Sequence, residues 1–383
     1  MNIGILTLHY VPNYGALLQA YATQRVLCEM VDSKEHVEII DYRPAEREML
    51  YSGKEAIKYL FDNHNISAVK RFIISFLSRG YYKSFRSSQR HFVDSNMSLS
   101  KRVCKKELRS EGKNYHAVIL GSDQVLNPFV INGDYSYLFD FVDCKKYSYA
   151  SSYGLKDFPE EKIEEYKKYL SEFTYISVRE SYGKDITNKI VGNEDTEVVL
   201  DPTLLVTKEE WKEIAGEKNA IYEKKKYITV YMVKPSEKLI DYANKLKENT
   251  GLDIIYIALP NTMREMPLLK RLGCKCDYSI KEWLAILANA EYVVTNSFHG
   301  VAFSLNFNRQ VFVQISNENT KANGRLENVV QLFGLTEHVI ENKIENPEDL
   351  DYTHINNVLN LERSKSIRYI KKIIDDMYSV EMH

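Results

Sequence analysis

The chain has 383 residues, of which 44% are hydrophobic and 27% charged, and its formal net charge is −2. This length is enough for two domains with hydrophobic cores of their own, and the charge balance excludes a broadly basic surface for nucleic acid or anionic lipid, although not a local basic pocket for a small anion. Five cysteines, an odd number on a long chain, argue against a disulfide framework.

The predicted elements of the N-terminal part alternate between short β-branched runs and longer amphipathic segments, which is typical of βαβ units with parallel sheets. The runs that predict strands are Ile3–Leu8, His36–Tyr42, His116–Asp123, Tyr147–Ala150, Thr174–Glu180 and Glu197–Thr203. Apolar spacing predicts a helix over Ala16–Met30. Polar-faced helices are predicted over Lys54–Phe76 and Tyr82–Phe92, and we interpret them as a helical insertion at about residues 54–110.

A second α/β series follows the charged, poorly patterned segment Gly216–Lys226, which we expect at the domain boundary. Its predicted strands are Tyr227–Val233, Asp253–Ala258, Tyr292–Ser297 and Val311–Ile315. Ser279 and Glu282 form a capping box for a helix over Ser279–Ala290. An apolar stripe at helical spacing predicts a C-terminal helix; its members are Ile367, Ile370, Ile374 and Met377.

The predicted fold class is therefore α/β, with two doubly wound domains and a ligand cleft at the carboxyl ends of their strands. We expect an N-terminal domain over residues 1–205, a C-terminal domain over 206–345, and a final helix over 346–383 that returns to the first domain. The N-terminal segment lacks the basic start and cleavage site of a signal peptide, and no stretch approaches the roughly 18 apolar residues of a membrane helix. These features predict a cytoplasmic protein.

Several cofactor motifs are missing from the sequence. No G-x-G-x-x-G follows a strand, and neither a phosphate-binding G-x-x-x-x-G-K-[ST] nor an H-E-x-x-H occurs. Cys274 and Cys276 form a C-x-C without a matching pair, and Asp349 and Asp351 lie in a linker-like segment. We therefore predict no metal and no cofactor.

The most informative segment runs from a buried strand into a helix rich in small residues, at Ser297, His299 and Gly300. A helix N-terminus offers free N–H groups and the positive end of the helix dipole, and an imidazole can carry charge, so the segment predicts an anion site. Gly300 permits close approach of the backbone to a ligand. The alternative is that Ser297 and His299 only cap the helix.

Polar groups also follow another buried strand, at Ser122, Asp123 and Gln124. Asp123 can accept a proton or orient a sugar hydroxyl; the alternative is an Asx-turn that closes the strand. Asn13, Tyr14 and Gly15 lie at a second helix start that faces the expected cleft, where Asn13 can also be a simple cap.

Two arginines complete the set of candidates. Arg179 ends a strand and suits bidentate binding of carboxylate or phosphate, or else a salt bridge to Glu180 or to the domain boundary. Arg325 lies just inside a helix start and is a second candidate for anion binding. Asp201 is predicted to be structural, because Pro202 ends its strand.

Six segments in this order resemble the polysaccharide pyruvyl transferase family over roughly residues 1–340. They are Asn13–Tyr21, Gly121–Gln124, Tyr149–Gly154, Ser177–Glu180, Asp201–Leu205 and Thr295–Gly300. The resemblance implies a GT-B-like fold of two Rossmann-like domains. It also implies transfer of pyruvate from phosphoenolpyruvate to two hydroxyls of one sugar, giving a cyclic ketal on a cell-surface or capsular glycan. Leu126 departs from the family, since relatives commonly have tryptophan there, and this change concerns the acceptor-side wall.

With this resemblance, the candidate residues receive roles. His299 binds the phosphate or acts as general acid, Arg179 and Arg325 clamp the donor anion, and Asp123 is the base or orients the acceptor. The donor side, in the second domain, also includes Ser297 and Gly300. The acceptor side, in the first domain, comprises Asn13, Tyr14, Gly15, Ser122 and Gln124.

The expected partners are phosphoenolpyruvate and a glycan or lipid-linked sugar acceptor, with no nucleic acid and at most peripheral contact with a membrane. The sequence predicts no oligomeric state. Two alternatives stay open: a GT-B glycosyltransferase that uses a nucleotide sugar, and a non-catalytic glycan-binding relative.

Overall fold

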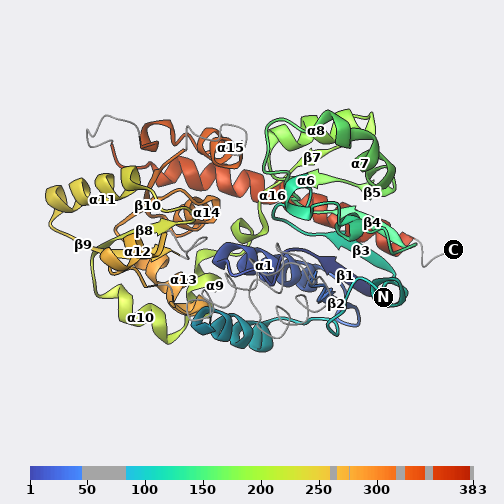
Figure 1. Cartoon of the computed structure of the whole chain (residues 1–383), viewed down its shortest axis with the longest axis horizontal. Helices are drawn as coiled ribbons and strands as arrows, with labels where there is room; N and C mark the ends of the chain where they lie inside the picture. The colour runs from blue at the N-terminus through green and yellow to red at the C-terminus, as the bar shows by residue number, and fades with distance from the viewer. Residues whose placement is uncertain (45–82, 259–264, 276, 316–323, 341–347, 380–383) are drawn as a thin grey trace, which may run out of the picture.

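The computed structural model describes residues 1–44, 83–258, 265–275, 277–315, 324–340 and 348–379. Its described residues contain two large parallel sheets with helices around them, each forming the centre of one lobe, and a further two-stranded sheet (Figure 1). The first sheet consists of β1 (Asn2–Leu6), β2 (His36–Ile39), β3 (Ala117–Leu120), β4 (Lys145–Ser148) and β5 (Phe173–Tyr175). The second consists of β8 (Tyr227–Met232), β9 (Asp253–Ala258), β10 (Tyr292–Thr295) and β11 (Gln310–Val313). The predicted fold class, α/β with two doubly wound domains, is confirmed.

The strand order is equivalent in the two sheets. The order is β2-β1-β3-β4-β5 in the first sheet and β11-β10-β8-β9 in the second. In each sheet, the strand that comes first in the sequence (β1 or β8) lies between the strands that come second and third. The direction in which the chain winds reverses at that strand. In open α/β sheets, ligands bind at this reversal, outside the carboxyl ends of the strands. Here these ends belong to β1 and β3, and to β8 and β10.

The helices follow the strands in the order expected of βαβ units. In the first lobe they are α1 (Tyr14–Met30), α5 (Leu108–Gly112), α6 (Pro128–Ile131), α7 (Ile163–Leu170) and α8 (Ser181–Val191). From there to the end of the second lobe they are α9 (Lys208–Ala215), α10 (Glu217–Glu223), α11 (Glu237–Thr250), α12 (Met266–Arg271), α13 (Ile280–Asn289), α14 (Phe298–Asn306) and α15 (Gly324–Leu332). Residues 83–96 are also helical, as predicted for Tyr82–Phe92, whereas Lys54–Phe76 lies outside the described residues.

Some predicted boundaries differ from those observed. The run Thr174–Glu180 forms two strands, because β5 joins the first sheet and β6 (Ser177–Val178) pairs instead with β7 (Glu197–Val198). β7 covers only Glu197–Val198, and a 3₁₀ turn over Pro202–Leu204 begins at Pro202. The charged segment before β8 contains the helix α10. The capping box of Ser279 and Glu282 is confirmed.

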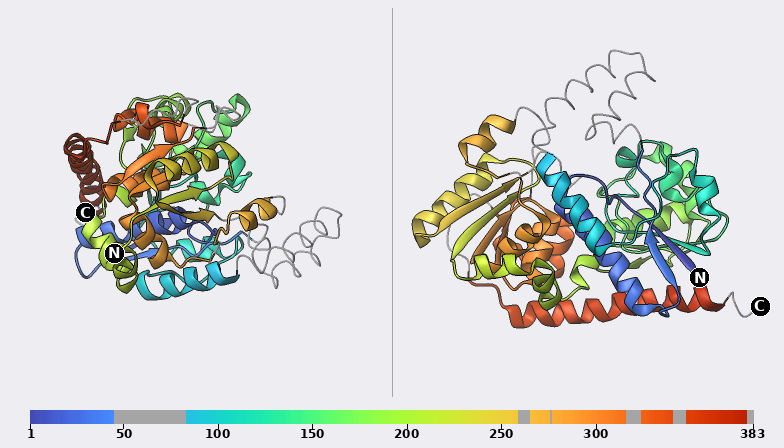
Figure 2. Two further views of the ribbon diagram at one scale, coloured as in Figure 1. Left: turned by 90° about the vertical axis from the view of Figure 1, so that its left-hand side faces the viewer. Right: turned by 90° about the horizontal axis from the view of Figure 1, so that it is seen from below.

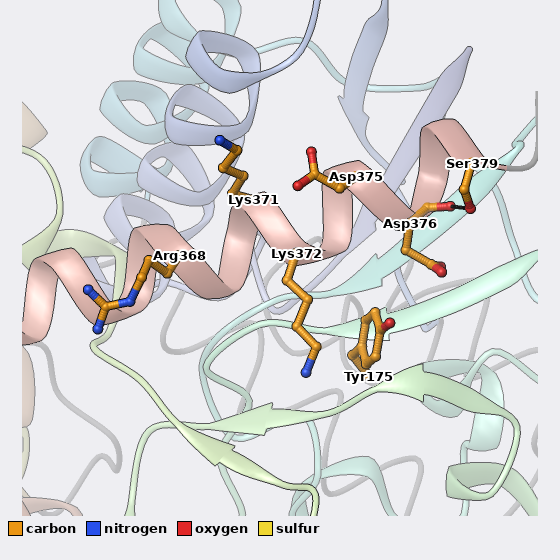
Figure 3. A pocket seen from close by; sticks show the side chains of 7 residues that line it. All are labelled: Tyr175, Arg368, Lys371, Lys372, Asp375, Asp376 and Ser379. Atoms are coloured by element: carbon orange, nitrogen blue, oxygen red, sulfur yellow. Dashed lines mark hydrogen bonds between the residues drawn. The ribbon is translucent and has the colours of Figure 1, made fainter.

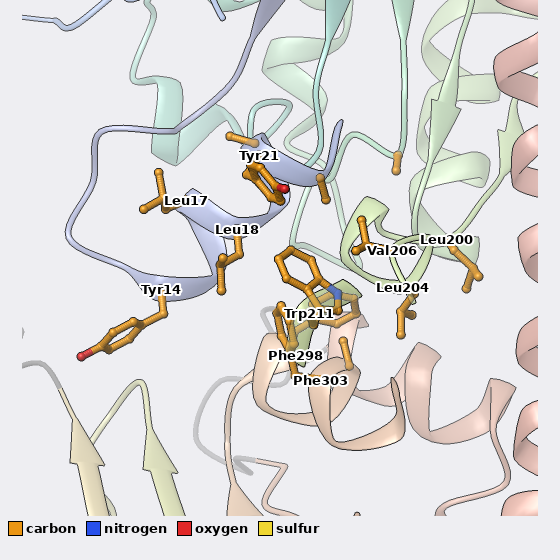
Figure 4. Close-up of a cluster of buried hydrophobic side chains, with 14 of the residues drawn as sticks. Tyr14, Leu17, Leu18, Tyr21, Leu200, Leu204, Val206, Trp211, Phe298 and Phe303 are labelled. Atoms are coloured by element: carbon orange, nitrogen blue, oxygen red, sulfur yellow. The ribbon is translucent and has the colours of Figure 1, made fainter. Parts of the chain in front are cut away.

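The two sheets share one continuous hydrophobic core. Leu18 and Tyr21 on α1 and Phe303 on α14 belong to the same buried cluster, and Trp211 of α9 lies between these helices (Figure 4). The Trp211 ring centroid is 5.7 Å from that of Tyr21 and 5.1 Å from that of Phe303. Aromatic rings at these separations attract one another beyond their burial. The position of one lobe on the other is therefore determined by packing.

The last helix, α16 (Tyr352–Ser379), runs along both lobes (Figure 2). Near the second sheet, Arg363 Nη2 donates to Asn306 Oδ1 at 3.0 Å. Farther along the helix, Ser366 Oγ accepts from the backbone N–H of Leu200 at 2.9 Å, and Asp376 accepts from the Tyr147 hydroxyl of β4 at 2.6 Å. Figure 3 shows the end of this helix beside β5. None of the helices among the described residues is both long and apolar enough to cross a lipid bilayer.

Trp211 tests the shared core. Trp211→Ala should lower the free energy of unfolding by about 3–5 kcal/mol, because it leaves a cavity between the lobes and removes the bond from the indole N–H to the Thr203 carbonyl. Ile221→Ala, at an exposed position of the neighbouring helix, is the control and should change stability by at most about 0.5 kcal/mol. Denaturant unfolding followed by circular dichroism measures both. Equal stabilities would show that the lobes do not depend on this contact.

Candidate functional site

Polar loops from both lobes meet where the carboxyl ends of the strands face one another. Asp123 follows β3, Arg179 and Glu180 follow β6, and Asp201 follows β7. His299 enters from the second lobe, in the first turn of α14. These five side chains are buried, and the other four all interact with Arg179 by contact or electrostatically. We call them, together with Arg325, the charged cluster.

Arg179 is the centre of the charged cluster. Its Nη1 donates to Asp201 Oδ2 at 2.6 Å, its Nε donates to Glu180 Oε1 at 3.2 Å, and its Nη2 lies 3.7 Å from Asp123 Oδ1. The guanidinium also stacks on the Phe298 ring, 4.4 Å from the ring centroid. The predicted salt bridge to Glu180 is therefore present. Binding of an anion by Arg179 would have to use Nη2, the nitrogen that donates no hydrogen bond.

Asp201 holds several segments of the chain together. Its Oδ2 also accepts from Ser122 Oγ at 2.8 Å, and its Oδ1 accepts from the Thr203 N–H at 3.0 Å and from the Thr203 hydroxyl at 2.7 Å. Burial alone would raise the pKa of Asp201, but His299, Arg179 and the bonds from Thr203 outweigh burial and hold this pKa below its usual range. Asp201 is therefore ionised, and both of its carboxylate oxygens accept hydrogen bonds within the protein.

His299 faces the cluster with an unsatisfied ring nitrogen. Its Nε2 lies 3.8 Å from Asp201 Oδ2, which is too far for a hydrogen bond, and has no partner among the described residues. Burial lowers the pKa of His299 to about 4, despite the opposing effect of Asp201, so the imidazole is neutral at pH 7. The helix cap is supplied by Ser297, whose hydroxyl accepts from the Gly300 N–H at 3.2 Å.

Gly15 determines where the imidazole lies. A Cβ built on Gly15 would come within 2.1 Å of the His299 ring, so any side chain at this position would displace the imidazole. Gly15 stands in the first turn of α1, which places the N-terminus of a first-lobe helix directly against His299 of the second lobe. The glycine is thus required by close approach.

Glu180 is a second buried acid of the cluster. Its Oε1 accepts from the Ser152 hydroxyl at 2.5 Å as well as from Arg179, and Ser152 Oγ in turn accepts from the Gly154 N–H at 3.0 Å. Burial raises the pKa of Glu180, with Arg179 opposing. Asp201 and Glu180 therefore differ: one is held ionised and the other is shifted toward its protonated form.

Arg325, in the first turn of α15, brings a second cation to the cluster. Its Nε is buried and has no partner among the described residues. Burial and the nearby Arg179 both lower the pKa of Arg325. Asn328 ties this helix to the first lobe, because its Nδ2 donates to the Arg179 carbonyl at 3.3 Å and its Oδ1 accepts from the Ser181 N–H at 3.1 Å.

The cluster therefore presents three buried nitrogens without a hydrogen-bond partner among the described residues: Arg179 Nη2, which is in ion-pair range of Asp123, His299 Nε2 and Arg325 Nε. Buried donors without partners cost about 1–3 kcal/mol each, and more when charged, so they are rarely left unsatisfied unless a ligand completes them. Next to them, the backbone of Asp123 adopts φ = 78°, a left-handed conformation that non-glycine residues rarely take and that recurs at functional sites. The arrangement is suited to bind a small anion.

The residues expected on the acceptor side have different surroundings. Asn13 Oδ1 accepts from the Ala16 N–H at 3.1 Å, which is the capping alternative. The Tyr14 ring stacks on Trp283, and its hydroxyl donates to the Tyr278 carbonyl at 2.8 Å, so this side chain joins the lobes. Ser122 is fully buried, and Gln124 accepts from Asn127 Nδ2 at 3.0 Å. Asp123 Oδ1 accepts from the N–H of the next residue, Gln124, at 2.8 Å, whereas the predicted Asx-turn would bond the N–H two residues on.

A cavity of about 360 Å³ borders the charged cluster between the two lobes. The first lobe contributes Arg179 and Asp201, and the second contributes Phe298 and Asn328. Sequence reasoning placed Arg179 here but missed Asp201 and Glu180 as members of the site. A strand-ending Asp before Pro signals a cap equally well, so only the spatial partners distinguish the two roles. No group of three or more metal-ligating side chains occurs among the described residues.

A family model described as polysaccharide pyruvyl transferase matches residues 13–317. The chain therefore belongs to the polysaccharide pyruvyl transferase family. Of the charged cluster, only Arg325 lies outside the matched residues. No curated protein matches the sequence.

Among solved structures, the chain is similar to the UDP-GlcNAc 2-epimerase of Methanocaldococcus jannaschii, with 11% identity, TM-score 0.47 and coverage of 94% of this chain and 99% of that chain. It is also similar to the UDP-N-acetylglucosamine 2-epimerase of Rickettsia bellii, with 12% identity and TM-score 0.49; the match covers 98% of this chain and 97% of that chain. The E. coli heptosyltransferase WaaC is similar with 12% identity and TM-score 0.38, and the match covers 83% of this chain and 89% of that chain. At such TM-scores, these likenesses assign no function.

The low pKa of His299 predicts a pH dependence of stability. Because the folded-state pKa is near 4 and the unfolded value near 6.5, the unfolded chain binds this proton first as the pH falls. The contribution of the neutral His299 to the free energy of unfolding is complete above about pH 6.5. As the pH falls from 6.5 to 4, up to about 3 kcal/mol of this free energy is lost. His299→Gln should lose less stability over this window in thermal unfolding. Parallel curves for the two proteins would mean that the imidazole is not buried in its neutral form.

Proposed function

We propose that the chain transfers the pyruvyl group of phosphoenolpyruvate to two hydroxyls of one sugar in a cell-surface or capsular glycan precursor, giving a cyclic ketal and inorganic phosphate. The observation that carries this proposal is the convergence of three buried nitrogens that lack hydrogen-bond partners, Arg179 Nη2, His299 Nε2 and Arg325 Nε. Phosphoenolpyruvate has a phosphate and a carboxylate and needs such donors; it needs neither a glycine-rich nucleotide loop nor a cofactor.

The chemistry requires groups of opposite character. The methylene carbon of the donor takes up a proton, positive charge develops at the ketal carbon, one sugar hydroxyl adds there, and a second hydroxyl replaces the phosphate. The arginines balance the charge that leaves with the phosphate. His299 is neutral before binding, and the approach of an anion favours its protonated form, so it can acquire the proton that the donor needs. Asp123, beside Arg179, is our candidate for receiving a hydroxyl proton.

Donor binding is the direct test. Phosphoenolpyruvate should stabilise the protein against heat, by about 2.7 kcal/mol at 100 times its dissociation constant. Arg325→Gln should abolish the stabilisation, whereas Arg368→Gln, on the far half of α16, should keep it. A panel of nucleotide sugars provides the comparison. Stabilisation by a nucleotide sugar but not by millimolar phosphoenolpyruvate would favour a glycosyltransferase, and binding without phosphate release in the presence of acceptors would favour a glycan-binding relative.

Substitution of His299 separates phosphate binding from proton transfer. His299→Ala should reduce turnover by about 10²–10⁴, the usual effect of a positioned acid or base, with little change in folding. His299→Gln can still donate a hydrogen bond to phosphate but cannot deliver a proton. Phosphate release that is partial with Gln and absent with Ala would favour phosphate binding, whereas equal loss would favour proton transfer. Unchanged turnover in both variants would place the chemistry elsewhere.

A further inference from the structure

Glu180 is the buried acid of the charged cluster to which the reaction described above gives no task. It is 3% exposed and stands at the N-cap of α8, directly after Arg179. The two hydrogen bonds that its carboxylate accepts, from Ser152 Oγ at 2.5 Å and from Arg179 Nε at 3.2 Å, both end on Oε1. The hydrogen of the acid form therefore belongs on the other oxygen, Oε2, from which the carboxyl can donate.

The geometry of Arg179 places this carboxyl beside the anion site. A guanidinium is planar, and its Nε and Nη2 donors leave one edge of it side by side. The Nε donor is taken by Glu180, whereas Nη2 has no hydrogen-bond partner among the described residues. An anion oxygen that accepts from Nη2 would therefore lie next to the Glu180 carboxyl.

The groups around Glu180 decide the form in which it meets an anion. The ionisable side chains that interact with it are Arg179 next to it, Arg325 from α15 and Tyr153 from the segment after β4. Burial raises the pKa of Glu180, although both arginines and the bond from Ser152 oppose this rise. A bound anion would raise this pKa further, because like charges disfavour each other. The acid form can donate to the anion, whereas the ionised form would repel it.

We propose that Glu180 is a further catalytic residue, which in its protonated form donates from Oε2 to the phosphate of the donor and then gives this proton to the phosphate as it leaves. This proposal rests on the function proposed above. The bond from the ketal carbon to the phosphate oxygen breaks, its electron pair stays on the phosphate, and the Glu180 proton neutralises one charge there. The second sugar hydroxyl bonds to the carbon and passes its proton to Asp123. Exchange with water then returns one proton to Glu180 and removes one from Asp123, so the protons balance.

Contact with the anion is tested by infrared difference spectra of the full chain with and without inorganic phosphate, recorded in H₂O and in D₂O. In the wild type, phosphate should change the C=O band of a protonated carboxyl. This change should be absent from Glu180→Gln and present in Glu111→Gln. Glu111, a buried acid of α5 that is 4% exposed, is the matched control outside the cluster. Phosphate binding without this change in the wild type, or with the same change in Glu180→Gln, would overturn the proposal.

Turnover separates a catalytic role of Glu180 from a structural one. With a panel of sugar acceptors, phosphate release by Glu180→Gln should fall by about 10²–10⁴, the usual effect of a positioned acid. Its affinity for phosphoenolpyruvate, measured by calorimetry, should stay close to that of the wild type, because the amide is neutral and can still donate a hydrogen bond. Glu111→Gln should release phosphate as the wild type does. A lower melting temperature of Glu180→Gln with unchanged turnover would mean that the carboxyl only braces Arg179.

Failure of this proposal and failure of the proposed function give different results. If the wild type binds phosphoenolpyruvate and releases phosphate, and Glu180→Gln does so equally fast, pyruvyl transfer stands and the role of Glu180 is wrong. If inorganic phosphate changes the carboxyl band but phosphoenolpyruvate does not bind, the contact of Glu180 with phosphate stands and pyruvyl transfer is rejected. The wild-type spectra decide about this contact even if Glu180→Gln does not fold.

Discussion

The buried ion pair between Arg179 and Asp201 is the interaction on which the site depends. Charges removed from water are stable only when paired and fully hydrogen-bonded, and loss of one partner leaves an uncompensated charge in the interior. Arg179 is surrounded by three carboxylates, and Asp201 by Arg179, Ser122 and Thr203. The loops after β3, β6 and β7 therefore hold one another in place. The pair fixes the guanidinium and with it the position of Nη2, which has no hydrogen-bond partner and lies 3.7 Å from Asp123 Oδ1.

The hydrophobic core shared by the lobes packs directly against the charged cluster. Phe298 contacts the Arg179 guanidinium on one side and belongs to the core that includes Trp211 on the other. Gly15 and Tyr14 begin α1 as neighbours: the first touches His299, and the second stacks on Trp283. Packing therefore aligns the two lobes before any ligand arrives. Donors that are already aligned need no reorganisation when charge develops, which is the condition under which electrostatic stabilisation is most effective.

Much of this arrangement could be predicted from sequence, for reasons that differ among residues. The strands and most helices follow from hydrophobic periodicity, and the capping box at Ser279 follows from local chemistry. The places of His299 and Arg179 after strands follow from the α/β pattern, because the carboxyl ends of parallel strands meet at one edge of a sheet. Asp201 was judged structural because its local signal, an Asp before Pro, is also that of a cap; its partners are distant in sequence. Tyr14 was placed on the acceptor side because sequence cannot show which lobe a side chain at a helix start will face.

The charge balance of the cluster constrains how an anion can bind. Arg179 and Arg325 carry positive charge, Asp123 and Asp201 carry negative charge, and the pKa of Glu180 is raised while that of His299 is lowered. The charges of the two arginines and the two aspartates cancel, and the raised pKa of Glu180 and the lowered pKa of His299 both favour the uncharged forms of these two side chains. Binding of phosphoenolpyruvate would then favour uptake of protons, because added negative charge raises the pKa of every nearby group. Under the proposed function, the donor would therefore bring into the site the proton that its own methylene carbon requires, and proton uptake would be part of binding.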